Sequence, residues 1–163
     1  MNREEGKGSL VGVCAAILIG VGANILKQAV YKLEISTRGQ GLYECTSSLA
    51  DWVSQQEIET GLLTVFCRHT SASLLIQENA DPTVQTDIKN YFDRLAPESA
   101  AYIHNYEGAD DMPAHLKTAL TSVQVSIPVM NGRMVLGTWQ GVYLFEHRVQ
   151  RHRREIVLHL IGE

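Results

Sequence analysis

The segment Val123-Gln-Val-Ser-Ile-Pro-Val-Met-Asn-Gly132 decides the fold class of this 163-residue chain. Apolar side chains occupy every second position from Val123 to Val129, which is the period of a β-strand with one buried face. The dipeptide Asn131-Gly132 that follows is a strong signal for a tight β-hairpin turn. The segment therefore predicts antiparallel strands on both sides of this turn.

The residues that follow the turn also have the composition of strands. We expect strands at 134–138, 142–147 and 155–161, which complete an antiparallel set. A basic run separates the last two. It is either a solvated hairpin turn or a clamp for a phosphate or another anion, and it contains Arg148, Arg151, His152, Arg153 and Arg154.

Helix signals lie upstream of the turn. The clearest helix has Asp81 as N-cap and Pro82 as its first residue, and apolar side chains follow at helical spacing up to position 95. A shorter helix is predicted to start near Pro113, and an earlier one to run from Thr46, as N-cap, to about position 59.

Three more strands are predicted upstream, at 28–37, 62–68 and 73–77. The order of strands and helices lacks the strict alternation of a doubly wound fold. We therefore predict an α+β fold with a mixed or antiparallel sheet and two to three helices. The length suits one domain, which we place at residues 25–163.

The N-terminal residues 1–24 hold an apolar run, Leu10–Ala23, which is shorter than the roughly 20 residues of a membrane span. It is an element added to the domain, a targeting or anchoring segment, or an extension from an upstream start. We expect an extension that is peripheral to function. We do not expect the protein to be embedded in a membrane.

Composition narrows the function class. The formal charge of −4 and the absence of an overall basic character argue against nucleic-acid binding. The cysteines Cys14, Cys45 and Cys67 match neither a disulfide framework nor a zinc spacing such as C-x-x-C. We therefore expect a reduced, cytoplasmic protein.

The loop at 103–115 gathers His104, Glu107, Asp110, Asp111 and His115. Imidazole and carboxylate are the usual protein ligands of divalent first-row metals, so the loop can supply two or three ligands to Mg or Zn. The alternative is a hydrated acidic loop in which Asp111 caps the helix that starts near residue 113.

A second group follows a predicted buried strand. His69, Thr70 and Ser71 can hold a phosphate through hydroxyl and backbone N–H donors, or can make only local hydrogen bonds at the strand end. No G-x-S-x-G elbow is present, although a Ser-His-Asp triad assembled from distant positions stays open.

Further polar candidates are scattered along the chain. Glu78 and Asn79 lie where a strand meets the best helix, and Lys117 either faces an anionic substrate or is solvated. Trp139 either stacks on a heterocycle or packs in a hairpin. Glu146 shares a strand face with apolar residues, where a carboxylate is costly unless it is paired or the face is wet.

Several motifs occur together and in order. They are His69-Thr-Ser-Ala-Ser-Leu74, Glu78-Asn-Ala-Asp-Pro82, the segment from His104 to Gly108, Ala114-His-Leu-Lys117, Gly137-Thr-Trp-Gln-Gly141 and the terminal Ile161-Gly-Glu163. This combination resembles the YjbQ family, described as secondary thiamine-phosphate synthases, and the resemblance covers about residues 26–163.

The resemblance implies an α+β homotrimer. It also implies an activity that joins hydroxymethylpyrimidine diphosphate to thiazole phosphate and releases pyrophosphate. His69, His104 and His115 sit at positions that the family's motifs mark. From these motifs and the residue chemistry we predict three sets of site residues. The catalytic set is His69, Glu78, Glu146 and Lys117, and the metal-binding set is His69, His104, His115 and Glu107. The substrate-binding set is Thr70, Ser71, Asn79, Trp139 and Gln140.

Three functions remain open at this point. The first is a metal-assisted transferase that acts on a phosphorylated small molecule. The second is a non-catalytic trimer that binds a metal or a small ligand. The third is a metal-dependent phosphoester hydrolase.

Overall fold

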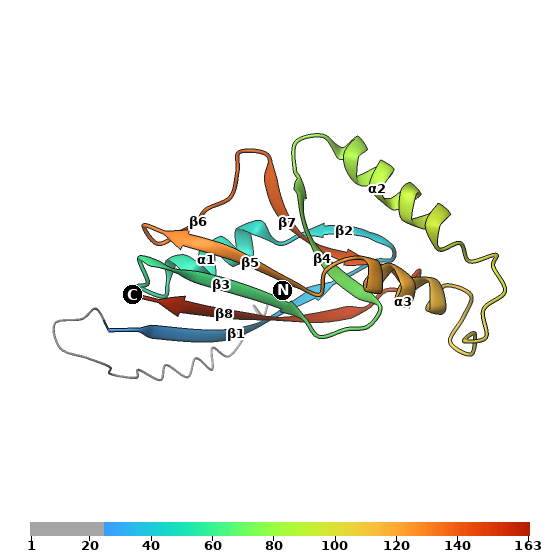
Figure 1. Ribbon diagram of the computed structural model, residues 1–163, viewed down its shortest axis with the longest axis horizontal. Coiled ribbons are helices and arrows are strands. Elements are labelled where there is room, and N and C mark those ends of the chain that lie inside the picture. The colour runs from blue at the N-terminus through green and yellow to red at the C-terminus, as the bar shows by residue number, and fades with distance from the viewer. Residues whose placement is uncertain (1–24) are drawn as a thin grey trace, which may run out of the picture.

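The computed structural model describes residues 25–163 (Figure 1). The predictions for residues 1–24, including the apolar run and Cys14, lie outside the described residues. In chain order the elements are β1 (Lys27–Ser36), β2 (Gly41–Glu44), α1 (Thr46–Ser54), β3 (Thr60–Cys67), β4 (Ala72–Glu78), α2 (Pro82–Leu95), α3 (Asp111–Leu120), β5 (Gln124–Met130), β6 (Arg133–Met134), β7 (Gln140–Glu146) and β8 (Arg153–Gly162).

The strands form two sheets in the described part of the chain. A five-stranded sheet has the order β1-β8-β3-β5-β6, and a three-stranded sheet has the order β2-β7-β4. Every strand pairing within them is antiparallel. The α+β prediction is confirmed, with all of its sheet pairings antiparallel.

The core joins both sheets to α1. Leu49 and Val53 of α1 belong to one buried cluster with Leu63 of β3, Leu158 of β8 and Leu144 of β7. β1 closes one edge with the predicted alternation, in which odd-numbered residues face the core and even-numbered ones face solvent. Burial of one face per strand is the main driving force that holds these layers together.

The predicted hairpin after β5 is confirmed. Asn131 and Gly132 adopt positive φ angles of 52° and 68°, as a type I′ turn requires. The strand that follows is shorter than predicted, because β6 contains only Arg133 and Met134.

Two predicted boundaries, both of the first helix, are wrong. Helix α1 ends at Ser54, and its N-cap is Cys45 rather than Thr46. The Thr46 hydroxyl instead donates to Glu44 Oε1 and accepts from the Val142 N–H. Helix α3 begins at Asp111, near Pro113 as predicted, and its N-cap is Asp110, so the alternative role of Asp111 as the cap is wrong.

The basic run is not a hairpin turn. Strand β7 belongs to the three-stranded sheet and β8 to the five-stranded sheet, so residues 147–152 cross from one sheet to the other. Arg148 and Arg154 are buried and paired with acids, whereas Arg151 and Arg153 are exposed. A solvated turn therefore describes only part of this run.

Helices α2 and α3 lie at the end of the molecule opposite to β6 and the C-terminus (Figure 1). Asp81 accepts a hydrogen bond from the Thr83 N–H at the start of α2, as predicted. No residue of α2 is fully buried within the described chain, although apolar side chains recur on one of its faces. From residue 25 onward, no helix has the length and apolar character needed to cross a bilayer.

Candidate metal centre

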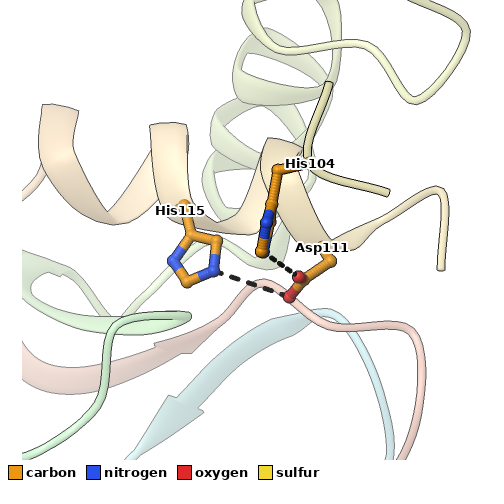
Figure 2. Close-up of side chains that lie close together, drawn as sticks. All are labelled: His104, Asp111 and His115. Atoms are coloured by element: carbon orange, nitrogen blue, oxygen red, sulfur yellow. Dashed lines mark ion pairs between the residues drawn. The ribbon is translucent and has the colours of Figure 1, made fainter. Parts of the chain in front are cut away.

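His104, Asp111 and His115 lie together at the start of α3, and both imidazole rings point toward the Asp111 carboxylate (Figure 2). Their candidate ligand atoms all lie within 4.8 Å of one another. His104 Nε2 is 2.8 Å from Asp111 Oδ2, and His115 Nε2 is 3.7 Å from Asp111 Oδ1. Two nitrogens and one carboxylate thus converge on a single point.

The fold positions these groups through one helix and one loop. Asp111 and His115 are four residues apart on α3, so helical geometry places them on the same face. His104 comes from the segment between α2 and α3. Asp111 is 2% exposed, whereas both rings are partly exposed, so the cluster opens toward solvent on the side of the imidazoles.

The backbone fixes the tautomer of His115. Its Nδ1 lies 2.9 Å from the Thr70 carbonyl oxygen. A carbonyl only accepts hydrogen bonds, so a neutral ring must carry its proton on Nδ1 and donate it there. The lone pair of Nε2 then faces the Asp111 carboxylate, and this is the usual arrangement of a metal-ligating histidine with its supporting carbonyl.

Asp111 Oδ2 accepts no hydrogen bond from the described residues, although His104 Nε2 is 2.8 Å away. That contact is a close approach of two potential ligand atoms without hydrogen-bond alignment. A buried carboxylate oxygen that lacks a partner is costly. A proton or a cation between Asp111 and the two imidazoles would remove that cost.

Arg148 supports the carboxylate from behind. Its guanidinium donates from Nη1 to Asp111 Oδ1, from Nε to Asp110 Oδ2 at 3.0 Å, and from Nη2 to the Glu107 carbonyl at 2.7 Å. Burial would raise the pKa of Asp110, but the Val149 N–H and the Arg148 guanidinium together hold it below its usual range. The first turn of α3 is therefore pinned to the crossover between the sheets.

Glu107 does not join the cluster. Its side chain is 72% exposed, and its carboxylate lies 3.6 Å from Arg148 Nη1. The carboxylate that the structure brings to the two imidazoles is Asp111, which sequence analysis had also considered as a helix cap.

His69 also lies outside this cluster. Its Nε2 accepts a hydrogen bond from the Glu155 N–H at 2.8 Å, so that nitrogen is already engaged. Burial, reinforced by the positive charge of Arg154, lowers the pKa of His69. The structure thus brings together two of the three histidines carried over from the family resemblance, and Thr70, next to His69, reaches His115 through its carbonyl.

Glu146 and Arg154 form a buried ion pair beside these residues. Glu146 also accepts from the Thr37 hydroxyl at 2.8 Å and from the Arg148 N–H at 3.0 Å. Burial would raise the pKa of Glu146, but these donors, led by Arg154, lower it overall. Arg154 also donates to the Ser71 hydroxyl at 3.1 Å, so Ser71 belongs to this network.

Lys117 is buried rather than solvated. Its ammonium donates to Asp93 Oδ1 of α2 at 2.6 Å. This ion pair joins α3 to α2. The ammonium group that was predicted to face an anionic substrate is therefore already paired with a carboxylate.

Comparison with known proteins identifies the family of this chain. The family model described as "UPF0047 protein YjbQ-like" matches residues 31–163. The chain belongs to the YjbQ family. Its resemblance to that family, noted from the motifs alone, is confirmed.

Relatives of this YjbQ-family chain span distant microbes. The UPF0047 protein sll1880 of Synechocystis is 52% identical over 80% of this chain and 90% of its own length. YjbQ of Escherichia coli O157:H7 is 40% identical over 80% of this chain and 96% of its own.

Solved structures show the same architecture. A YbjQ-like protein of unknown function from Sulfolobus solfataricus superimposes with a TM-score of 0.75 at 25% identity, covering 83% of this chain and 99% of that one. A conserved hypothetical protein from Thermus thermophilus gives 0.69 at 35% identity, with 78% and 97% covered.

The remaining site candidates of the YjbQ-family chain lie elsewhere. Glu78 pairs with Gln140 at one end of the β4–β7 ladder, and the Asn79 N–H donates to the Trp139 carbonyl at 3.0 Å. Ala72 and Glu146 end the same ladder on the other side, six residues away, or about 20 Å along the strand. Trp139 is 64% exposed, so it is not a buried hairpin residue.

For this YjbQ-family chain, sequence reasoning considered Asp111 but chose Glu107 for the metal set, and it missed the supporting role of Arg148. The i, i+4 spacing of Asp111 and His115 was visible once the helix was known to start at Asp111. The role of Arg148 had no local signal, because it reaches the loop from 37 residues further along the chain.

Proposed function

We propose that this YjbQ-family protein is a metal-dependent enzyme that acts on a phosphorylated small molecule. A divalent ion would be held by His104, Asp111 and His115. The observation that carries the proposal is the convergence of two ring nitrogens and one buried carboxylate within 4.8 Å.

The cluster fits the size of such an ion. Ligands at about 2.0–2.2 Å from one zinc ion lie roughly 3–4 Å from each other. The nitrogen–oxygen distances of 2.8 and 3.7 Å lie close to this range. Two imidazoles favour zinc over magnesium, because magnesium prefers a shell of oxygen ligands. Three protein ligands leave a position open for substrate or water.

The chain's own residues would orient these ligands. The Thr70 carbonyl holds the tautomer of His115, and Arg148 holds the Asp111 carboxylate. When bound, a divalent ion supplies positive charge that stabilises a leaving phosphate or pyrophosphate. We infer from the family resemblance that the reaction is of the thiamine-phosphate synthase type. It would join hydroxymethylpyrimidine diphosphate to thiazole phosphate and release pyrophosphate.

We further propose that the protein acts as a cytoplasmic homotrimer. The assembly rests on the family resemblance alone. The location is supported by the free, buried thiols of Cys45 and Cys67, since buried reduced cysteines are typical of intracellular proteins.

A second candidate function is a non-catalytic trimer that binds a metal or a small ligand. It is favoured by the pairing of polar groups next to the cluster. Glu146 is bound to Arg154, Lys117 to Asp93, and His69 to the backbone of Glu155, so none of these is free to act on a substrate without rearrangement. A metal-dependent phosphoester hydrolase remains the third candidate.

Metal titration tests the centre before any activity is known. After chelation with EDTA, zinc binding is measured by isothermal titration calorimetry for the wild type and for Asp111→Asn and His115→Ala. Loss of a supporting residue alone weakens metal sites about 10–100-fold, so loss of a ligand should weaken zinc binding by about 100-fold or more. His159→Ala is the control, because His159 is a partly buried histidine on β8 outside the cluster.

Activity then separates the candidates. Purified protein is incubated with both thiamine precursors and either zinc or magnesium, and in parallel with generic phosphomonoesters. Thiamine phosphate formed by the wild type and lost in Asp111→Asn supports the transferase. Metal binding without turnover of any substrate supports the binding trimer. Absence of stoichiometric zinc binding in the wild type would refute the metal centre.

A further inference from the structure

A cavity of about 610 Å³ opens where the end of β1 meets the crossover from β7 to β8. It is lined by Ser36, Thr37, Arg38, Arg151, His152 and Arg153. Three of these side chains are guanidinium groups, and none of the six is acidic. The metal centre contributes no residue to this cavity.

Two of the arginines have no acidic partner. Among residues 25–163, no carboxylate lies within ion-pair distance of Arg38 or Arg151, and both side chains are exposed. Arg153 has only a solvent-exposed contact, with Glu34 at 3.6 Å. Such surface pairs contribute little and are easily replaced. The cavity therefore presents positive charge that the protein itself leaves uncompensated.

Hydrogen bonds hold the walls of the cavity in a defined position. The Thr37 N–H donates to the His152 carbonyl at 2.8 Å, and the His152 N–H donates to the Thr37 hydroxyl at 3.0 Å. These reciprocal bonds extend the β1–β8 ladder by one step beyond Ser36 and Arg153. They fix Arg38 and Arg151, the next residues outward, on neighbouring backbone segments.

The turn after β1 is held as tightly. The Arg38 N–H donates to the Tyr43 hydroxyl at 2.7 Å, and that hydroxyl donates to the Gly39 carbonyl at 2.8 Å. Gly39 has a φ of +130°, and a Cβ at this position would meet the Val149 carbonyl oxygen at 2.9 Å. Only glycine allows the turn to approach the crossover this closely.

Negative charge near the cavity is already neutralised. The nearest buried carboxylate, Glu146, accepts from Thr37 and is paired with Arg154 behind the wall. His152 completes the lining, and its Nε2 is enclosed without a hydrogen-bond partner among the described residues. A ligand that draws this ring toward the cavity would give that nitrogen a partner.

We propose that this cavity, the Arg38–Arg151 pocket, binds the phosphate or diphosphate group of a small molecule. Guanidinium groups make paired, charge-assisted hydrogen bonds to phosphate oxygens. A volume of about 610 Å³ lies in the usual range for small-molecule sites and exceeds what one inorganic phosphate fills. The ligand therefore carries an organic part or a second phosphate. The proposal does not depend on a metal at His104, Asp111 and His115.

Calorimetric titration with inorganic pyrophosphate tests the pocket, using the full chain in EDTA so that no metal contributes. The wild type should bind, and Arg38→Gln and Arg151→Gln should each weaken binding about tenfold, because each removes a charge-assisted contact. Arg94→Gln is the matched control, since Arg94 is an exposed arginine on α2 that lines no part of the pocket. Thermal melts should match the wild type for all three variants, because each side chain is exposed.

Three results would overturn the proposal. They are an absence of pyrophosphate binding by the wild type in EDTA, equal binding by the Arg38, Arg151 and Arg94 variants, and tighter binding of a short single-stranded oligonucleotide than of pyrophosphate. His115→Ala should retain pyrophosphate binding. If the wild type binds zinc but not pyrophosphate, only the pocket proposal is refuted. If it binds pyrophosphate but not zinc, only the metal centre is refuted.

Discussion

Acidification from pH 7 to pH 5 should destabilise the fold through His147, which directly follows strand β7 and is 1% exposed. Its Nε2 lies 2.9 Å from the Ser73 hydroxyl, and its ring lies against Phe145, with 4.3 Å between the ring centroids. Its Nδ1 has no partner among the described residues. Burial, followed by the positive charge of Lys117, lowers the pKa of His147 to about 3.

The direction of the effect follows from proton linkage. The unfolded chain protonates His147 near pH 6.5, whereas the folded chain keeps the ring neutral down to about pH 3. Stability is therefore complete above pH 6.5 and falls steadily as the pH drops toward 3. For these two pKa values, the free energy of unfolding decreases by about 2 kcal/mol between pH 7 and pH 5. Glu146 and Asp110 have lowered pKa values, so their contributions are lost only at more acidic pH.

Urea unfolding at pH 7, 6 and 5 and at constant protein concentration measures this loss. The variant His147→Gln should lose about 2 kcal/mol less than the wild type over this interval, whatever its stability at pH 7. Ser73→Ala is the control, because it leaves the ring buried and should keep the wild-type dependence on pH. His69, whose pKa is also lowered, contributes equally to all three proteins. If His147→Gln and the wild type showed the same change in unfolding free energy, the argument from burial would be refuted.

Three further substitutions probe the framework. Glu146→Gln leaves the buried Arg154 without a counter-charge and should lower the unfolding free energy by about 3–5 kcal/mol, measured by urea denaturation; a loss below 1 kcal/mol would mean that water reaches the pair. Gly162→Ala places a Cβ 2.1 Å from the Thr60 carbonyl and should cost at least about 1–3 kcal/mol by overpacking, measured in the same way. Gly132→Ala has room but a positive φ of 68°, so it should cost only about 1–2 kcal/mol; a larger loss than that of Gly162→Ala would contradict the close approach at β8.

Local signals in the sequence predicted much of the fold. The alternation in β1, the Asn131-Gly132 turn and the start of α2 at Asp81-Pro82 each depend on neighbouring residues alone, and each matches the structure. Strand β2 was missed because its four residues are too short to show a period. The end of α1 was placed five residues late, because no proline or glycine marks Ser54 as the last helical residue.

The division into two sheets could not be predicted locally. Strand β7 follows the β5–β6 hairpin along the chain, yet it pairs with β2 and β4 rather than with β8. These pairings join segments about 100 and 70 residues apart, and single-sequence periodicity carries no information on such partners.

The candidate centre was predictable in part. His104 and His115 stood out because a loop has no packing reason to collect imidazoles and carboxylates. Choosing Asp111 over Glu107 required knowing the first residue of α3. The engagement of His69 with the Glu155 N–H required the register of β8, which the sequence does not reveal.

Helix α2 makes an unusual contribution to the centre. A 14-residue helix with no fully buried side chain is marginal by itself in water. However, Asp93 of α2 is the counter-ion of Lys117, a residue of α3 whose side chain is almost completely buried. Detachment of α2 would separate that ammonium from its counter-ion, so the ion pair with α3 opposes undocking of α2. Because α3 also carries Asp111 and His115, any force that lifts α2 acts on the element that holds two of the three metal-ligand candidates.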